Sequence, residues 1–111
     1  MSSITTHILD TTKGKPAVGI KIDLFEYKHD HWDKLTEAIT NNDGRVGKLY
    51  EDDVIGKRVF KIKFETGSYF IQQNIENFYP YVEIVFNVNS NEHYHVPLLL
   101  NPFGYSTYRG S

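Results

Sequence analysis

Cysteine is absent from this chain of 111 residues. Its absence excludes a disulfide framework, a thiolate nucleophile and a zinc site built on cysteine ligands. It also removes the usual sequence sign of the redox compartment. Any chemistry must therefore rest on other side chains.

A surplus of positive charge is also missing. The chain has 12 basic and 14 acidic residues and a net charge of −2, so it offers no broad basic field to nucleic acid. Apolar runs long enough to cross a bilayer are missing too, and residues 1–6 lack the basic and apolar regions of a signal peptide. We expect no nucleic-acid or membrane partner, and a cytoplasmic location, or a periplasmic one if a leader has been removed.

Helical spacing of apolar residues is scarce, and alternation with a period of two is common. Such alternation predicts half-buried β-strands. It places Val18, Ile20, Ile22 and Leu24 on one side of a strand, and it recurs in residues 60–64 and 82–86. We therefore expect several short strands in sequence.

Turn-forming residues separate these strands. They gather at positions 12–16, 41–44, 52–56 and 87–91, where Gly, Asn, Asp and Pro favour tight reversals of the chain. Short strands divided in this way are typical of a β-sandwich. Because no repeat or interdomain linker is present, residues 1–111 are predicted to form a single domain.

One segment departs from the alternation. Its apolar and amide residues lie roughly where one stripe of a helix would be, at Phe70, Ile71, Asn74, Ile75 and Phe78. Gly67-Ser68 precedes the stripe as an N-cap. The pattern predicts one short helix over residues 68–77.

Histidine placement is the most informative chemical feature. His93 and His95 lie two apart in a predicted strand, so both rings point to the same face. An exposed polar face is the plainer interpretation, and two ligands of a zinc site with a third from elsewhere is the alternative. His29 and His31 repeat the spacing in a polar stretch, where we expect the exposed end of a hairpin.

Two further residues are candidates for a site. His7 lies among hydroxyl and aliphatic residues, so its ring is expected to be partly buried and held by a defined partner. Arg45 follows Asp43-Gly44 at the start of a predicted strand, where a solvated charge beside a turn would also explain it. Neither residue defines a site alone.

The C-terminal residues add a more specific pattern. An ordered last strand explains the apolar half of residues 97–111, but it does not require the ending Tyr108-Arg109-Gly110-Ser111. Together with residues 93–100 and 105–107, this ending resembles the C-terminal signature of 5-hydroxyisourate hydrolases of the transthyretin-related family. Residues 7–10 with 14–17 resemble the opening signature of that family, residues 40–45 the middle one, and residues 78–80 a block before a late strand.

The resemblance implies an all-β, transthyretin-like sandwich of two four-stranded sheets with one short helix, assembled as a homotetramer whose active sites lie at a dimer-dimer interface. It implies hydrolysis of the small-molecule substrate 5-hydroxyisourate to 2-oxo-4-hydroxy-4-carboxy-5-ureidoimidazoline in urate degradation, a part of purine catabolism, with no cofactor and no metal. It assigns catalysis to His7, Arg45, His95 and Ser111. It assigns substrate binding to His7, Arg45, Tyr108 and Arg109.

The implied reaction has clear chemical needs: an activated water, a place for carbonyl negative charge, and a proton for the departing nitrogen. An imidazole with a pKa of about 6.5 suits the base, so His7 or His95 is the candidate. Arg45 stays cationic and can hold the anionic ring or its oxyanion through a planar fork. Tyr108 can stack or hydrogen-bond, and Ser111 can orient a histidine or the water, or act as a nucleophile.

Two other functions compete with hydrolysis. A non-catalytic, transthyretin-like carrier of small ligands would have the same fold, because fold does not determine function. A hormone-binding channel, however, does not need His7, Arg45, His95 and the Tyr-Arg-Gly-Ser ending together. A zinc protein using His93, His95 and His7 is the third interpretation, and the resemblance accounts for His95 without a metal.

Overall fold

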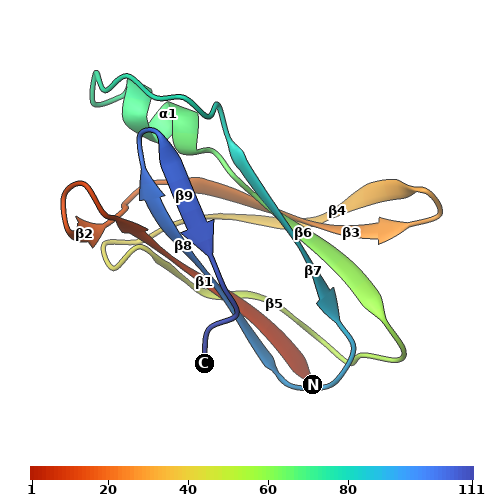
Figure 1. The fold of residues 1–111 in the computed structure, drawn as a ribbon. Coiled ribbons are helices and arrows are strands. Elements are labelled where there is room, and N and C mark those ends of the chain that lie inside the picture. The colour runs from red at the N-terminus through yellow and green to blue at the C-terminus, as the bar shows by residue number, and fades with distance from the viewer.

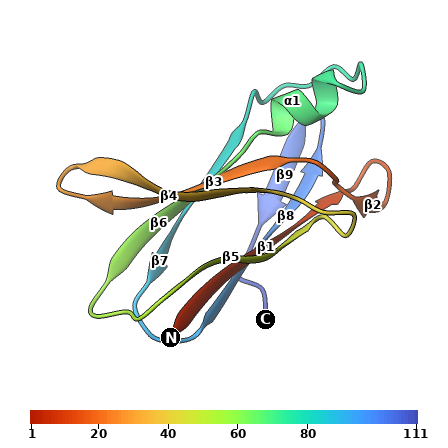
Figure 2. The ribbon, with the colours of Figure 1, turned by 180° about the vertical axis from the view of Figure 1, so that it is seen from behind.

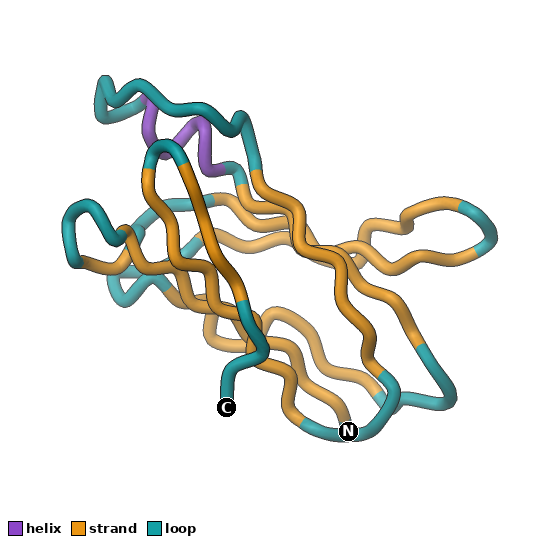
Figure 3. Tube along the Cα trace, in the orientation of Figure 1, coloured by secondary structure: helices purple, strands orange, loops and turns teal.

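The computed structural model describes all residues, 1–111, and shows two β-sheets with one short helix (Figures 1 and 3). The strands are β1 (Ser2–Asp10), β2 (Lys15–Pro16), β3 (Lys21–Lys28), β4 (His31–Ile39), β5 (Arg45–Asp52), β6 (Arg58–Phe64), β7 (Val82–Val88), β8 (His93–Asn101) and β9 (Gly104–Thr107). The helix is α1 (Thr66–Ile71). The predicted all-β sandwich with one short helix is confirmed.

The five-stranded sheet is built around β1 and β8, which run parallel with Thr5 opposite His95. Its order is β2-β1-β8-β9, and β5 pairs with β1 as well. The two-residue β2 pairs with Leu9 and Asp10, beyond the part of β1 that β5 covers. The sheets therefore have five and four strands instead of four each, because β2 and β5 share one edge of β1.

The four-stranded sheet has the order β4-β3-β6-β7 and is antiparallel throughout. β3 and β4 form a hairpin that projects beyond the rest of the molecule, as the two opposite views show (Figures 1 and 2). Its turn residues His29 and Asp30 have φ values of 51° and 64°, as a tight two-residue hairpin requires. His29 and His31 are exposed there, which confirms the prediction for these two histidines.

The core lies between the two sheets and follows the alternation seen in the sequence. Every second residue of β1, β3, β6 and β8 points inward, and the fully buried side chains include Ile8, Ile22, Leu24, Phe60, Ile62, Phe64 and Leu98. Each such side chain contributes about 2 kcal/mol by leaving water. The residues of β1 and β8 that alternate with them face outward on the five-stranded sheet.

Val18 does not share this inward face, and here the alternation was misleading. Its side chain is 46% exposed, whereas Ile20, Ile22 and Leu24 are buried. The reason is Gly19, whose φ of 81° turns the chain before β3 begins at Lys21. Val18 therefore belongs to the preceding turn.

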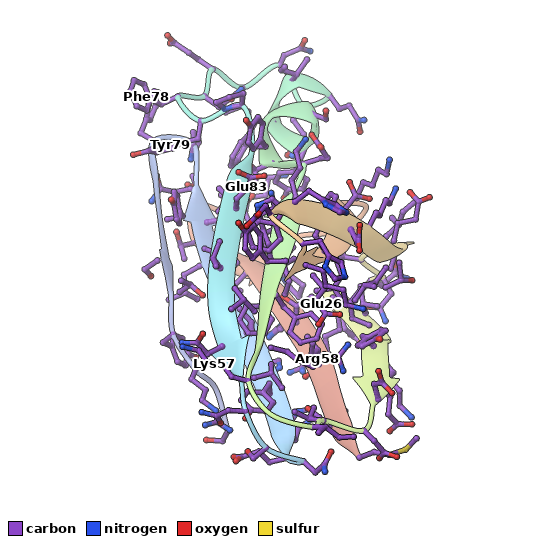
Figure 4. All side chains as sticks on the ribbon, turned by 90° about the vertical axis from the view of Figure 1, so that its right-hand side faces the viewer. Glu26, Lys57, Arg58, Phe78, Tyr79 and Glu83 are labelled. Atoms are coloured by element: carbon purple, nitrogen blue, oxygen red, sulfur yellow. The ribbon has the colours of Figure 1, made fainter.

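A buried ion pair joins β3 and β6 of the four-stranded sheet, and Arg58 extends it to β5 of the other sheet. The guanidinium of Arg58 on β6 meets both carboxylate oxygens of Glu26 on β3, each at 2.8 Å, and Asp52 of β5 at 3.0 Å. Glu26 is only 3% exposed, and its side chain lies beside that of Arg58 in Figure 4. The Arg58 guanidinium holds the pKa of Glu26 below its usual value, so the carboxylate stays charged inside the fold.

The helix is shorter than predicted and begins earlier. It covers Thr66–Ile71, its N-cap is Glu65 without a side-chain capping bond, and Ser68 lies inside it. It cannot continue to residue 77, because Asn74 has a φ of 58°. The expected stripe is buried only in part, since Phe70 is 2% exposed but Ile71 and Phe78 are 67% and 70% exposed. No helix of this length and composition could span a membrane.

Candidate active site

The candidate site lies on the outer face of the five-stranded sheet. Because side chains alternate across a strand, the buried Ile4, Thr6 and Ile8 leave Ser3, Thr5 and His7 of β1 facing outward. On β8, Tyr94 and Val96 are buried, so His93 and His95 face the same way. The sequence prediction that His93 and His95 share one face is confirmed by their nearly parallel rings, whose centroids lie 6.3 Å apart.

Strand register brings the predicted residues together. His7 is paired with Arg45 of β5 on one side and with Pro97 of β8 on the other. His95 lies opposite Thr5 of β1, two positions from His7 along that strand. Diagonal neighbours at this offset are within reach of long side chains. His7, Arg45 and His95 therefore lie close together although they come from three strands.

A groove of about 400 Å³ opens on this face and is lined mainly by polar residues. Its lining residues are Thr5, Thr6, Asn41, Arg45, Val46, Gly47, His93, His95 and Ser111. Three of the four predicted catalytic residues, Arg45, His95 and Ser111, are among them. His7 is not part of the lining and lies beside Arg45 in the neighbouring strand.

The two histidines of β8 are joined through hydroxyl groups of β1. Thr5 Oγ1 lies 2.8 Å from His95 Nδ1 and 3.1 Å from His93 Nε2. Ser3 Oγ lies 2.8 Å from His93 Nδ1. These distances are hydrogen bonds, so a continuous chain runs from Ser3 through His93 and Thr5 to His95. The opposite nitrogen of His95, Nε2, has no partner in the protein.

Both candidate bases are held neutral by their surroundings. Burial lowers the pKa of His95 from 6.5, and the charge of Arg45 and repulsion from the neighbouring rings of His93 and His7 lower it further. Burial lowers the pKa of His7 as well, together with the charge of Arg45, while the backbone and carboxylate of Asp43 partly oppose this change. At neutral pH each ring therefore has a free nitrogen lone pair that can accept a proton.

A tight turn places Arg45 at the start of β5. The side-chain oxygen of Asn41 accepts hydrogen bonds from the backbone of Asp43 at 2.9 Å and of Arg45 at 3.1 Å. Gly44 has a φ of 70°, and an added Cβ there would lie 2.5 Å from the backbone oxygen of Ile8. The turn needs glycine at this position for both reasons. The predicted turn at 41–44 thus sets the direction in which Arg45 leaves the backbone.

The C-terminal residues pack against His95. The backbone N–H of Gly110 donates to the carbonyl of His95 at 2.8 Å, and the two residues form an isolated β-bridge. A Cβ on Gly110 would lie 2.5 Å from Cδ2 of the His95 ring. The absence of a side chain at Gly110 therefore lets the backbone pack directly on the imidazole, with Ser111 at the groove.

Tyr108 and Arg109 do not line this groove. Arg109 Nη2 donates to Glu92 at 2.6 Å, and its guanidinium lies 4.4 Å from the centre of the Tyr94 ring. Both Tyr108 and Arg109 line a second cavity of about 330 Å³, bounded by residues of β7 and β8 such as Phe86. The single chain therefore does not bring these two predicted substrate-binding residues to its own groove.

The sequence did not single out Ser3, Thr5 or Asn41 as parts of the site. Hydroxyl residues are ordinary in strands, and an Asn before Asp-Gly is ordinary in turns. The pairing of Ser3 and Thr5 with residues about 90 positions away, as for Thr5 with His95, leaves no local signature. The zinc alternative required His7 beside His93 and His95, and no group of three or more His, Cys, Asp or Glu side chains is arranged to hold a metal ion.

Comparison with known proteins places the chain in a family. Residues 4–110 match the model of the HIUase/Transthyretin family. The chain belongs to this family. It is similar to a 5-hydroxyisourate hydrolase of Halalkalibacterium halodurans, with 43% identity over 97% of each chain. It is also similar to the 5-hydroxyisourate hydrolase of Mus musculus, with 42% identity over 99% of this chain and 96% of the other.

Solved structures that match this chain include members of two branches of the family, the 5-hydroxyisourate hydrolases and the transthyretins. A Klebsiella pneumoniae 5-hydroxyisourate hydrolase superimposes with a TM-score of 0.86 at 31% identity, covering 98% of this chain and 99% of the other. Sea bream transthyretin, in complex with thyroxine, gives a TM-score of 0.91 at 27% identity, covering 97% and 94%. The backbone therefore does not separate the branches. The curated relatives at about 40% identity are hydrolases, and the chain is an enzyme of this hydrolase branch.

Proposed function

We propose that the chain hydrolyses 5-hydroxyisourate to 2-oxo-4-hydroxy-4-carboxy-5-ureidoimidazoline, a step of urate degradation. The observation that carries the proposal is the groove, which brings a cation, Arg45, to a neutral imidazole, His95, on an open polar surface. The substrate is inferred from the relatives, which are 5-hydroxyisourate hydrolases. The groove supplies the two kinds of group that ring-opening by water needs.

In this proposal His95 is the general base, because its Nε2 has no protein partner and the ring lines the groove. As the oxygen of a water molecule bonds to the ring carbonyl carbon, Nε2 takes the proton of that water. The carbonyl electron pair moves onto its oxygen, where Arg45 stabilises the negative charge. The carbonyl then re-forms, the carbon-nitrogen bond breaks, and the departing nitrogen takes the proton from His95.

The other predicted residues support this step in different ways. His7 lies beside Arg45, where it can hold the part of the substrate that the Arg45 guanidinium binds. Ser111 at the edge of the groove can orient the water, and the step does not require it as a nucleophile. Because Tyr108 and Arg109 do not reach their own groove, we propose that they complete the groove of a neighbouring copy in a homotetramer.

The test uses freshly generated 5-hydroxyisourate and follows its ultraviolet absorbance against the spontaneous decay. We expect the decay to accelerate with enzyme and the acceleration to fall about a hundredfold or more in His95→Ala. His31→Ala is the matched control, because it removes an imidazole from the distant exposed hairpin. No acceleration by the natural sequence, together with tight binding of a hydrophobic ligand, would instead support the carrier function.

A further inference from the structure

The hydrogen-bonded chain next to His95 consists of polar groups on the outer face of the five-stranded sheet, outside the core. Ser3 Oγ, His93, Thr5 Oγ1 and His95 follow one another at 2.8, 3.1 and 2.8 Å. His93 is exposed and His95 is half-buried. The chain therefore leads from the candidate base to a ring that water can reach.

The single hydrogen of the Thr5 hydroxyl restricts both rings. Thr5 Oγ1 contacts Nδ1 of His95 but Nε2 of His93. The hydroxyl donates to one of these nitrogens, so the other nitrogen must itself carry hydrogen and donate to the oxygen. When both rings are neutral, they must therefore have the same tautomer, with hydrogen either on both Nδ1 atoms or on both Nε2 atoms.

The charges around the groove favour hydrogen on Nδ1. Arg45 lines the same groove as His95, and a cation there favours a lone pair, not an N–H, on the unpartnered Nε2. The other charged or titratable groups near the two rings are His7 on β1, and Glu92 and Arg109 beside His93. With hydrogen on Nδ1, His95 is ready to accept a proton at Nε2, and His93 donates to Ser3.

We propose that Thr5 and His93 are positioning residues that fix the tautomer of His95 and take over the proton it accepts. This inference rests on the proposed function. When His95 gains a proton at Nε2, its Nδ1 proton passes to Thr5 Oγ1 while the hydroxyl hydrogen of Thr5 passes to His93 Nε2. No atom is gained or lost, and the positive charge moves from the half-buried ring beside Arg45 to the exposed ring of His93. Reversal of the same transfers returns the proton for the departing nitrogen.

The tautomers are measured on the full-length protein by long-range proton-nitrogen NMR of the histidine rings at neutral pH. We expect hydrogen on Nδ1 of both His93 and His95, and the same result in Thr5→Ser, which keeps the hydroxyl. Thr5→Val, which removes it, should release His95 toward the Nε2 form. Different tautomers in the two rings, or an unchanged His95 in Thr5→Val, would overturn the proposal.

Turnover gives a second measurement on the same variants. Thr5→Val and His93→Gln should each lower kcat about tenfold with KM nearly unchanged, and Thr5→Ser should restore most of the loss. Thr11→Val is the control, because its hydroxyl bonds only to the carbonyl of Leu100. Normal kcat in both Thr5→Val and His93→Gln would contradict the relay. Failure of the unsubstituted protein to accelerate hydrolysis would contradict the proposed function. The NMR measurement of the tautomers does not depend on turnover, so it tests the positioning role separately.

Discussion

Gly110 shows how one missing side chain can set the position of a neighbouring ring, here that of His95, the proposed base. A Cβ at this residue would meet the His95 ring at 2.5 Å, which is far inside van der Waals contact. Gly110→Ala should push the ring from its place and lower turnover about a hundredfold, because small misplacements of a reacting group are costly. Its melting temperature should change little, since the residue lies outside the core.

Gly104→Ala is the matched control for this prediction. Its Cβ would lie 3.7 Å from the Asn101 side chain, an ordinary contact. Kinetics and thermal unfolding of both variants provide the comparison. Equal turnover in Gly110→Ala and Gly104→Ala would show that the close contact with His95 does not matter for the reaction.

The lowered pKa values of His7 and His95 set the expected pH dependence. A base must be neutral, so activity should be nearly constant well above pH 6.5 and should decline with a midpoint below that ordinary histidine pKa. The structure thus moves the midpoint of the decline to a lower pH than the value of about 6.5 expected for an unperturbed ring. A decline that is already complete at pH 6.5 would argue against a buried histidine base.

The same shifts affect stability, with a definite sign. Well above pH 6.5 both rings are neutral in the folded and unfolded chain, so they contribute no pH dependence there. As the pH falls through 6.5, the unfolded chain takes up protons first, and stability declines until the folded rings are protonated too. Urea unfolding at several pH values should show this decline, and a double variant His7→Gln, His95→Gln should lack that part of it.

Individual residues of the site were predictable to different degrees. His7, Arg45 and His95 belong to recognisable local signatures, and alternation along β1 and β8 placed the two histidines on the outer face. Thr5 and Ser3 were not predictable, because their roles depend on register between distant strands. The path of Tyr108 and Arg109 away from the groove depends on Glu92 and Tyr94, which sequence spacing does not relate to them.

At the scale of elements, alternation of side chains was a reliable guide and helical spacing was not. Strands β3, β6 and β7 follow the predicted alternation because each has one face on the core. The helix begins earlier than predicted, where the N–H of Gly67 bonds to the carbonyl of Pro80, and it cannot reach residue 77 because Asn74 adopts a positive φ. A stripe of five residues cannot reveal these two constraints.

The ion pair between Glu26 of β3 and Arg58 of β6 should be sensitive to substitution because it is buried. Glu26 is 3% exposed and receives two hydrogen bonds from the guanidinium. Glu26→Gln should leave Arg58 without its main counter-charge and cost about 3 kcal/mol in the free energy of unfolding. Denaturant unfolding measures this loss.

Glu37→Gln is the control for Glu26→Gln. Glu37 also pairs with two cations, Lys21 and Lys34, but its side chain is 55% exposed, and water screens such pairs. We expect a much smaller change in this variant. Comparable losses in the two variants would mean that burial of the Glu26 pair does not determine its contribution.

At the scale of the whole molecule, the separation of Tyr108 and Arg109 from their own groove predicts sharing between copies. β7 and β9 are edge strands of their sheets, and exposed edges favour pairing with another subunit. We predict a homotetramer by light scattering.

We also predict that His95→Ala and Tyr108→Ala, each nearly inactive, regain about a quarter of full activity when refolded together. Random mixing leaves both residues intact in about that share of the sites.

A second mixture tests the same arrangement. His95→Ala refolded with Arg45→Ala should regain no activity, because both residues line the groove of one chain and every groove would lack one of them. Recovery in this mixture, or a fully active monomer, would contradict sites shared in the proposed way.

The parallel pairing of β1 with β8 also has a consequence for folding kinetics. Thr5 and His95 are 90 positions apart, whereas β3 and β4 meet across a two-residue turn. Closing a long loop is slower than closing a short one. Trp32, the single tryptophan, packs on Tyr27 in that hairpin with ring centres 5.2 Å apart. During refolding, tryptophan fluorescence should therefore recover before turnover, and a chain that stalls midway would keep its hairpin but lack the groove.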